Sequence, residues 1–183
     1  EYSSNKTTLD YGDFLLWLRS IIANSNKFDN SDKISDIQNA IDTQLRAGVG
    51  TIGEISSFGL SASLCAKSAI RTIYFSEILG SNGAILDKQW DRFLHRFNLA
   101  NELKSDLFIP AISVHSPYST HIDLAKKAIN LAKNSDMMIS THFMESLDEK
   151  LWLESGSGGF SKFFKEFNNL AKPFYTPSEF IEL

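Results

Sequence analysis

Strand-like and helix-like segments alternate along most of this 183-residue sequence, and this alternation limits the folds that it can adopt. Short runs rich in β-branched and aromatic residues predict four strands, at residues 49–56, 71–79, 108–114 and 137–143. Apolar residues at helical spacing predict helices at residues 10–23, 31–47, 60–68, 85–103, 120–134, 146–154 and 160–171, and Thr176-Pro177-Ser178-Glu179 predicts a further helix start. Because such units join parallel strands through right-handed crossovers, we predict an α/β fold built on a parallel sheet. Four strands fit a small open sheet or half of an eight-stranded barrel, and the sequence pattern alone does not distinguish between these two folds.

The composition excludes several classes of partner. A net charge of −4 and a pI near 5.6 give no sign of a nucleic-acid partner. No apolar run reaches the roughly 18–20 residues that a bilayer span requires, and no signal peptide is visible, so we expect no membrane partner. Cys65 is the only cysteine, which excludes an intramolecular disulfide and fits a reducing compartment. We therefore expect a cytoplasmic protein with one globular core.

Two of the predicted strands end in a histidine. The apolar run at residues 137–143 predicts a buried strand that delivers His142 at its C-terminal end, and His115 directly follows the strand at residues 108–114. Sites collect at the C-terminal ends of strands in α/β folds, and neutral imidazole is a common ligand of zinc, iron and nickel. Glu145, three residues after His142, is placed to move a proton from an activated water to a leaving nitrogen. The alternative is two core histidines and a glutamate that favours the N-terminus of the next helix.

Other polar and aromatic residues are weaker candidates for the site. Glu54 and Glu77 lie on or near apolar strands, where a carboxylate needs a partner, so ligand binding and a solvated strand end are both open. His115 can bind a metal or hydrogen-bond to a substrate. Trp17 fits a core position or a platform for a substrate ring. Cys65 has no recognisable base near it in the sequence, and we interpret it as a packing residue.

Two motifs resemble those of a known family. The segments Ser113-Val114-His115-Ser116-Pro117-Tyr118 and Ile139-Ser140-Thr141-His142-Phe143-Met144-Glu145 resemble the amidohydrolase superfamily, in its branch of cytosine deaminases, chlorohydrolases and adenosine-type deaminases. Within this branch, the 6-aminodeoxyfutalosine deaminases are the most similar group, through Tyr11-Gly12-Asp13-Phe14-Leu15-Leu16-Trp17-Leu18 and Gly50-Thr51-Ile52-Gly53-Glu54-Ile55. The resemblance covers essentially the whole chain. The motifs are fairly specific for the superfamily and only weakly specific for the substrate.

The resemblance implies a (β/α)8 TIM barrel with one divalent metal, zinc or iron, and a small nucleoside-like substrate. It implies metal binding by His142 and proton transfer by Glu145. It implies a substrate contact for His115, and a place in the substrate pocket for Trp17, Glu54 and Glu77. The expected reaction is the hydrolytic deamination of a purine-like ring, with aminodeoxyfutalosine of menaquinone synthesis as a candidate substrate.

The sequence departs from the family pattern in its metal ligands. The family's His-x-His pair at the end of the first strand is missing, as are a histidine after strand six and an aspartate after strand eight. We therefore expect residues 1–183 to be a single partial domain, with about four parallel strands that correspond to strands two to five. One metal ligand cannot hold a catalytic metal, so we expect the fragment alone to be inactive. Open sheet edges predict a homo-oligomer or pairing with the missing half of the barrel.

Two alternative functions remain open from the sequence. A chlorohydrolase or another heterocycle deaminase would use the same residues. A flavodoxin-like binding or regulatory domain without catalysis would show a glycine-rich or acidic cluster at its switch point, and the sequence shows neither.

Overall fold

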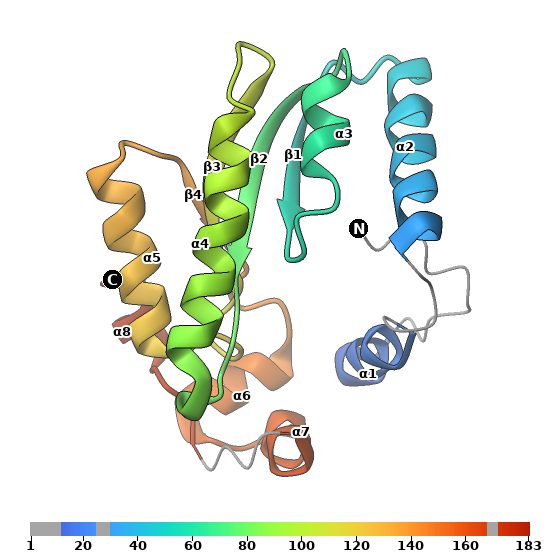
Figure 1. Ribbon diagram of the computed structural model, residues 1–183. Helices are drawn as coiled ribbons and strands as arrows, with labels where there is room; N and C mark the ends of the chain where they lie inside the picture. The colour runs from blue at the N-terminus through green and yellow to red at the C-terminus, as the bar shows by residue number, and fades with distance from the viewer. Residues whose placement is uncertain (1–11, 25–29, 168–171) are drawn as a thin grey trace. The chain divides into compact units, whose positions relative to one another are not determined.

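The structure, a computed structural model, contains a parallel sheet of four strands. It describes residues 12–24, 30–167 and 172–183. The strands are β1 (Thr51–Ser56), β2 (Arg71–Ile78), β3 (Phe108–Val114) and β4 (Ile139–Thr141), and their order in the sheet is β1-β2-β3-β4 (Figure 1). Backbone hydrogen bonds from Thr72 N–H to Leu107 O and from His115 N–H to Ile78 O join β2 to β3. Strand order therefore follows chain order, as the prediction of a partial (β/α)8 barrel requires.

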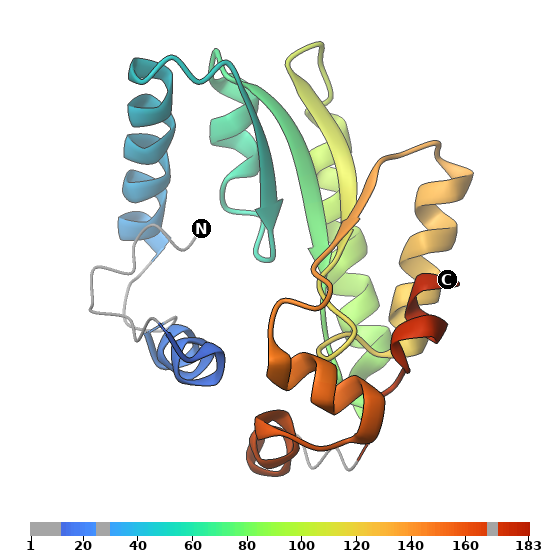
Figure 2. The same cartoon turned by 180° about the vertical axis from the view of Figure 1, so that it is seen from behind.

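Helices flank the strands and connect them (Figure 2). They are α1 (Phe14–Asn24), α2 (Asn30–Arg46), α3 (Ala62–Lys67), α4 (Leu86–Glu102), α5 (Ile122–Asn134), α6 (Leu147–Ser155), α7 (Gly159–Phe167) and α8 (Pro177–Ile181), with a 3-10 turn η1 at Gly83–Ile85. These bounds agree with the predicted helices to within a few residues. The predicted helical residues 10–11 and 168–171, and the first part of the motif at residues 11–18, lie outside the described residues. None of the described helices combines the length and the apolar character that a membrane span needs.

The chain forms two compact units, and the first contains residues up to 76 together with residues 94–111. Its core takes side chains from α2, α3, α4 and the β2 and β3 segments, and consists of Ile37, Ile41, Ala62, Cys65, Ile70, Tyr74, Ala100 and Phe108. Tyr74 and Phe108 place their rings 5.1 Å apart, which is a favourable aromatic contact. The buried Cys65 lies in this core and is a packing residue, as predicted.

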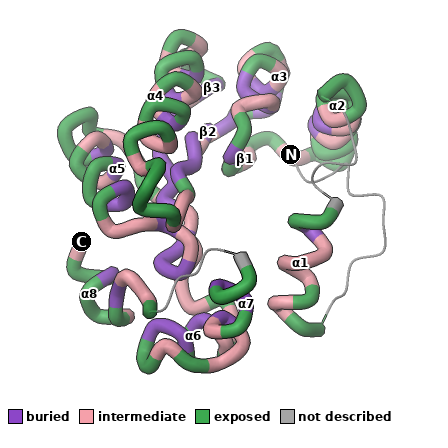
Figure 3. The backbone as a smooth tube through the Cα atoms, turned by 60° about the horizontal axis from the view of Figure 1, so that its bottom comes forward, coloured by how far each residue is buried: buried purple, intermediate pink, exposed green. Residues whose placement is uncertain are grey.

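The second unit contains residues 77–93 and 112–183. One face of α5 is buried (Figure 3) and consists of Leu124, Ala125, Ala128 and Ala132. The three alanines are small, so the helix can pack closely there. Aromatic side chains fill the space between α6 and α7, where Trp152 and Phe160 both contact Phe164. Buried Tyr175 donates a hydrogen bond from its hydroxyl to Thr120 O at 3.1 Å, which fixes the segment before α8 to the start of α5.

The fourth strand differs from its prediction. We predicted a buried strand over residues 137–143, whereas β4 covers only Ile139–Thr141, and Met138 and Ile139 are 45% and 46% exposed. The physical reason is pairing, because among the described strands β4 has a neighbour, β3, on one side only. The prediction of a strand that delivers His142 at its end is confirmed, but the prediction that this strand is buried is wrong.

Candidate active site

Three neighbouring strands bring polar side chains to one edge of the second unit. Glu77 is the penultimate residue of β2, and His115 and His142 directly follow β3 and β4. The backbone ladder continues past the strand ends, because His115 N–H donates to Ile78 O at 3.0 Å and His142 N–H donates to His115 O at 2.8 Å. Glu77, His115 and His142 each offer a ligand atom, and these atoms all lie within 4.8 Å of one another. Parallel pairing thus places one carboxylate and two imidazoles side by side.

Hydroxyl groups hold the His115 ring. Its Nδ1 lies 2.6 Å from Ser119 Oγ and 2.9 Å from Ser116 Oγ, and the two hydroxyls contact each other at 2.7 Å. Burial, together with the nearby His142, lowers the pKa of His115 to about 4. At neutral pH the ring is therefore uncharged, and Nε2 is the ring nitrogen that remains for a metal or a substrate.

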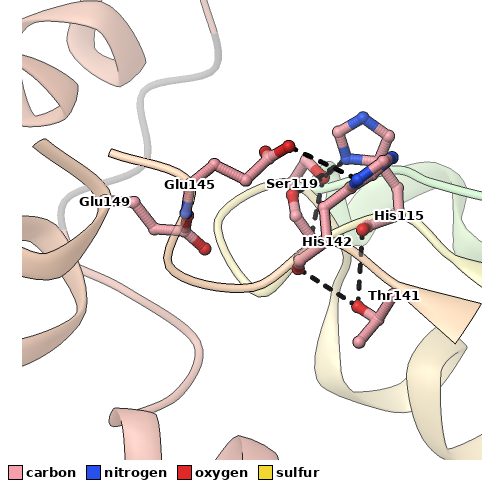
Figure 4. A network of polar contacts seen from close by, with 7 residues as sticks. His115, Ser119, Thr141, His142, Glu145 and Glu149 are labelled. Carbon is pink, nitrogen blue, oxygen red and sulfur yellow. Dashed lines mark hydrogen bonds and ion pairs between the residues drawn. The ribbon is translucent and has the colours of Figure 1, made fainter. Parts of the chain in front are cut away.

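Glu145 reaches back from the loop after β4 to His142 (Figure 4). Its Oε1 lies 3.3 Å from His142 Nδ1, and the two side chains are 32% and 36% exposed. Between them, Met144 has a φ angle of +57°, which is unusual for a residue other than glycine. The spacing of three residues therefore brings the carboxylate onto the imidazole through a left-handed turn. Solvent can reach both groups, as proton exchange with a water molecule requires.

Glu149 supports this turn from the first turn of α6. The residue is completely buried, and its Oε2 accepts a hydrogen bond from Glu145 N–H at 2.7 Å. Its other oxygen, Oε1, is buried without a hydrogen-bond partner among the described residues. Burial raises the pKa of Glu149, while the backbone amides of Glu145 and Met144 oppose this by stabilising the carboxylate. Burial of a carboxylate is costly, so the position of Glu149 needs a reason beyond packing.

The sequence analysis did not identify Glu149, although a local signal was present. Ser146-Leu147-Asp148-Glu149 has the spacing of a capping box, and Ser146 Oγ accepts from Glu149 N–H at 3.1 Å, as such a box predicts. The glutamate of a capping box normally returns to the amide of the N-cap residue itself. Here it bonds to the amide of Glu145, one residue earlier, and so connects the helix to the candidate site.

The other predicted site residues lie in the first unit or away from the strand ends. Trp17 is half-buried on α1, with its ring 5.7 Å from that of Phe14, and Glu54 is half-buried on β1. Both belong to the first unit, and their predicted roles stay predictions. The structure thus brings together Glu77, His115, His142 and Glu145 from the predicted set.

The donor atoms at the strand ends fit a divalent metal. Imidazole nitrogens and a carboxylate oxygen are ligands that zinc and ferrous iron accept, and neutral imidazole is the form that binds. The low pKa of His115 keeps its ring in this form at neutral pH. Where the sequence alone offered one metal ligand, the fold provides three side chains of suitable chemistry in one place. Such a set has fewer ligands than a closed structural site and leaves room for further ligands or water.

The chain is similar to known proteins along most or all of its length. The sequence model of the amidohydrolase family matches residues 3–172. The chain is 40% identical to the aminodeoxyfutalosine deaminase of a Nitratiruptor species over 183 residues, which is 100% of this chain and 45% of that protein. It is 38% identical to an adenosine deaminase of Helicobacter pylori over 167 residues, covering 91% of this chain and 40% of that protein.

The fold of the chain is also similar to that of a solved structure. The crystal structure of Helicobacter pylori aminofutalosine deaminase in complex with methylthio-coformycin matches with a TM-score of 0.89 at 34% identity. The match covers 99% of this chain and 44% of that chain. The chain therefore spans less than half the length of the relatives that it matches.

Proposed function

Because the chain belongs to the amidohydrolase family, we propose that it is part of a metal-dependent enzyme that deaminates a purine-like nucleoside by hydrolysis. The observation that carries this proposal is the meeting of Glu77, His115, His142 and Glu145 at the ends of neighbouring strands. The deaminase names of the relatives support the reaction class, and aminodeoxyfutalosine is the first candidate substrate. Membership of this family argues against the flavodoxin-like alternative.

His142 is the proposed metal ligand of this chain. One divalent cation, zinc or iron, would supply Lewis acidity that lowers the pKa of a water molecule. Ligands from outside residues 1–183 would complete its coordination, so residues 1–183 form a partial catalytic domain in this proposal. A carboxylate oxygen of Glu77 lies within 4.8 Å of a ring nitrogen of each histidine, and Glu77 is proposed to contact the substrate, as are Trp17 and Glu54.

Glu145 is the proposed proton carrier. Its carboxylate contacts His142 at 3.3 Å and remains partly exposed, so it can accept a proton from the attacking water and pass it to the leaving amino group. His115 is proposed to contact the substrate ring as a neutral imidazole, because its Nδ1 is already engaged by two serine hydroxyls. Because Cys65 is the only cysteine among the 183 residues, we also propose a cytoplasmic location.

The test uses the complete gene product that contains this chain. Release of ammonia from aminodeoxyfutalosine and adenosine is measured for the wild type, Glu145→Gln and His142→Ala, together with metal content. We expect Glu145→Gln to keep its metal and to lose about a hundredfold or more in kcat, because general acid–base catalysis contributes this much. We expect His142→Ala to lose the metal.

The control is Glu154→Gln, which changes an exposed glutamate on α6 and should leave both quantities unchanged. A chlorinated heterocycle in the same assay distinguishes a chlorohydrolase from a deaminase. If the complete protein binds no divalent metal, or if both variants deaminate as the wild type does, the proposed function is wrong.

A further inference from the structure

A buried carboxylate next to the proposed proton carrier has no role in the mechanism described so far. Glu149 is 0% exposed, yet it lies in the first turn of α6, a position where glutamate normally faces water. Its Oε2 accepts the N–H of Glu145 at 2.7 Å, which is short for an N–H to oxygen bond and typical of a charged acceptor. The bond joins the helix to the backbone of Glu145.

The segment that Glu149 holds has an unfavourable backbone conformation. Met144 has a φ angle of +57°, and no glycine or asparagine is present there to adopt it without strain. A left-handed residue in such a position persists only when its surroundings fix it. Glu149 supplies that constraint, because the amides on both sides of this conformation, those of Met144 and Glu145, stabilise its carboxylate.

The turn decides where the side chain of Glu145 points. Glu145 Oε1 lies 3.3 Å from His142 Nδ1 (Figure 4), and Met144, which directly precedes Glu145, has the left-handed φ angle. Glu149 holds this segment through both its backbone and its side chain. Its N–H donates to Ser146 Oγ at 3.1 Å, and its carboxylate accepts from Glu145 N–H. Ordinary capping of α6 explains the first bond and does not explain the second.

We propose that Glu149 is a positioning residue, which holds the left-handed turn at Met144 and thereby keeps the Glu145 carboxylate against His142. This inference rests on the proposed function, in which Glu145 carries the proton. A displacement of about 1 Å can cost roughly a hundredfold in rate, so a change at position 149 acts on kcat although Glu149 touches neither substrate nor metal.

The test compares three variants of the complete, metal-loaded gene product. Glu149→Gln keeps an oxygen that can accept the Glu145 N–H but removes the negative charge. Glu149→Asp keeps the charge but is one methylene shorter, so that it no longer reaches this amide. Glu149→Ala removes both. Glu154→Gln, on the exposed face of the same helix, is the matched control.

Positioning predicts an order of activities that a charge or proton-transfer role does not. We expect Glu149→Gln to retain kcat within about threefold, and Glu149→Asp and Glu149→Ala to lose about tenfold or more, with KM and metal content within about twofold of the wild type. If Glu149→Ala does not fold, the comparison of the Gln and Asp variants still decides. A higher kcat for Glu149→Asp than for Glu149→Gln, or wild-type kcat in all variants, overturns the proposal.

A crystallographic measurement separates this proposal from the proposed function. The distance from Glu145 Oε1 to His142 Nδ1 is determined in the wild type and in the Gln and Asp variants. We expect the contact to be kept in Glu149→Gln and lost in Glu149→Asp, whether or not the wild type deaminates the chosen nucleosides. A contact that is kept in both variants overturns the positioning role. An inactive wild type with the expected distances contradicts only the proposed function.

Discussion

At the scale of single residues, two serine hydroxyls decide how His115 is presented to a ligand. Ser119 Oγ lies 2.6 Å from His115 Nδ1 and also donates to Ser116 O at 3.3 Å, so it connects the ring to the loop backbone. We expect Ser119→Ala to lower kcat/KM of the complete protein about fivefold, because a net hydrogen bond contributes about 1 kcal/mol. Steady-state kinetics measure this, with Ser157→Ala as a control on an exposed serine. An unchanged kcat/KM for Ser119→Ala would mean that His115 needs no such support.

The sequence predicted some site residues and not others, for physical reasons. His115 and His142 could be predicted because an apolar run that ends in a histidine marks a strand end, and parallel strand ends meet. Glu145 could be predicted as a site residue because it lies three residues after His142. The capping-box spacing was a signal for Glu149 as a cap of α6, but its bond to Glu145 could not be predicted, because that bond accompanies the left-handed conformation of Met144, and methionine gives no signal for it.

At the scale of elements, helix α8 begins with a capping box in which both expected hydrogen bonds are present. Thr176 Oγ1 accepts from Glu179 N–H at 3.3 Å and Glu179 Oε2 accepts from Thr176 N–H at 2.7 Å, which is the predicted capping box. The Thr176 N–H, and the Thr176 hydroxyl that also donates to Oε2 at 2.9 Å, lower the pKa of Glu179 below its usual value of 4.5. A lowered pKa in the folded state stabilises the fold at pH values above 4.5, and this stabilisation is lost as the pH falls through the folded pKa.

The lowered pKa of Glu179 predicts that the stability of the fold depends on pH. We expect Glu179→Gln to lower the thermal unfolding midpoint at pH 7, and the difference from the wild type to shrink when the pH is brought to about 3. Thermal unfolding followed by circular dichroism at both pH values measures it. Glu182→Gln, an exposed change just after the same helix, is the control. A difference of equal size at pH 7 and pH 3 would show that the ionised carboxylate is not what stabilises the cap.

The elements themselves were predicted to different degrees. Strand β3 and helix α2 match their predicted bounds closely, because apolar periodicity and terminal residues are local signals. Within α2 the apolar residues at helical spacing are only partly buried, since Ile37 and Ile41 are in the core while Ile34 is 43% exposed. Strand β4 is shorter than predicted because strand length depends on pairing with a neighbour, which a local pattern does not contain.

At the scale of the whole molecule, the chain spans less than half the length of the relatives that it matches, and the sheet formed by its described strands has two outer strands. Among the described strands, β1 pairs only with β2 and β4 only with β3. Unpaired backbone groups and apolar side chains on an outer strand favour pairing with another chain. Ile139 on β4 is 46% exposed, and no lysine or proline lies within β4 to prevent such pairing. The predicted self-association thus has a specific candidate location.

We therefore expect the isolated 183-residue chain to form dimers or larger species through the β4 edge. Ile139→Lys should shift the chain toward a monomer, because a charge on an outer strand opposes edge-to-edge pairing. Size-exclusion chromatography with light scattering over a range of concentrations measures the mass, and circular dichroism checks that the variant is folded. Ile181→Lys is the matched control, since Ile181 is an isoleucine that is 70% exposed on α8. If Ile181→Lys dissociates the chain as strongly as Ile139→Lys, general apolar exposure rather than the β4 edge drives association, and a monomer at every concentration contradicts self-association altogether.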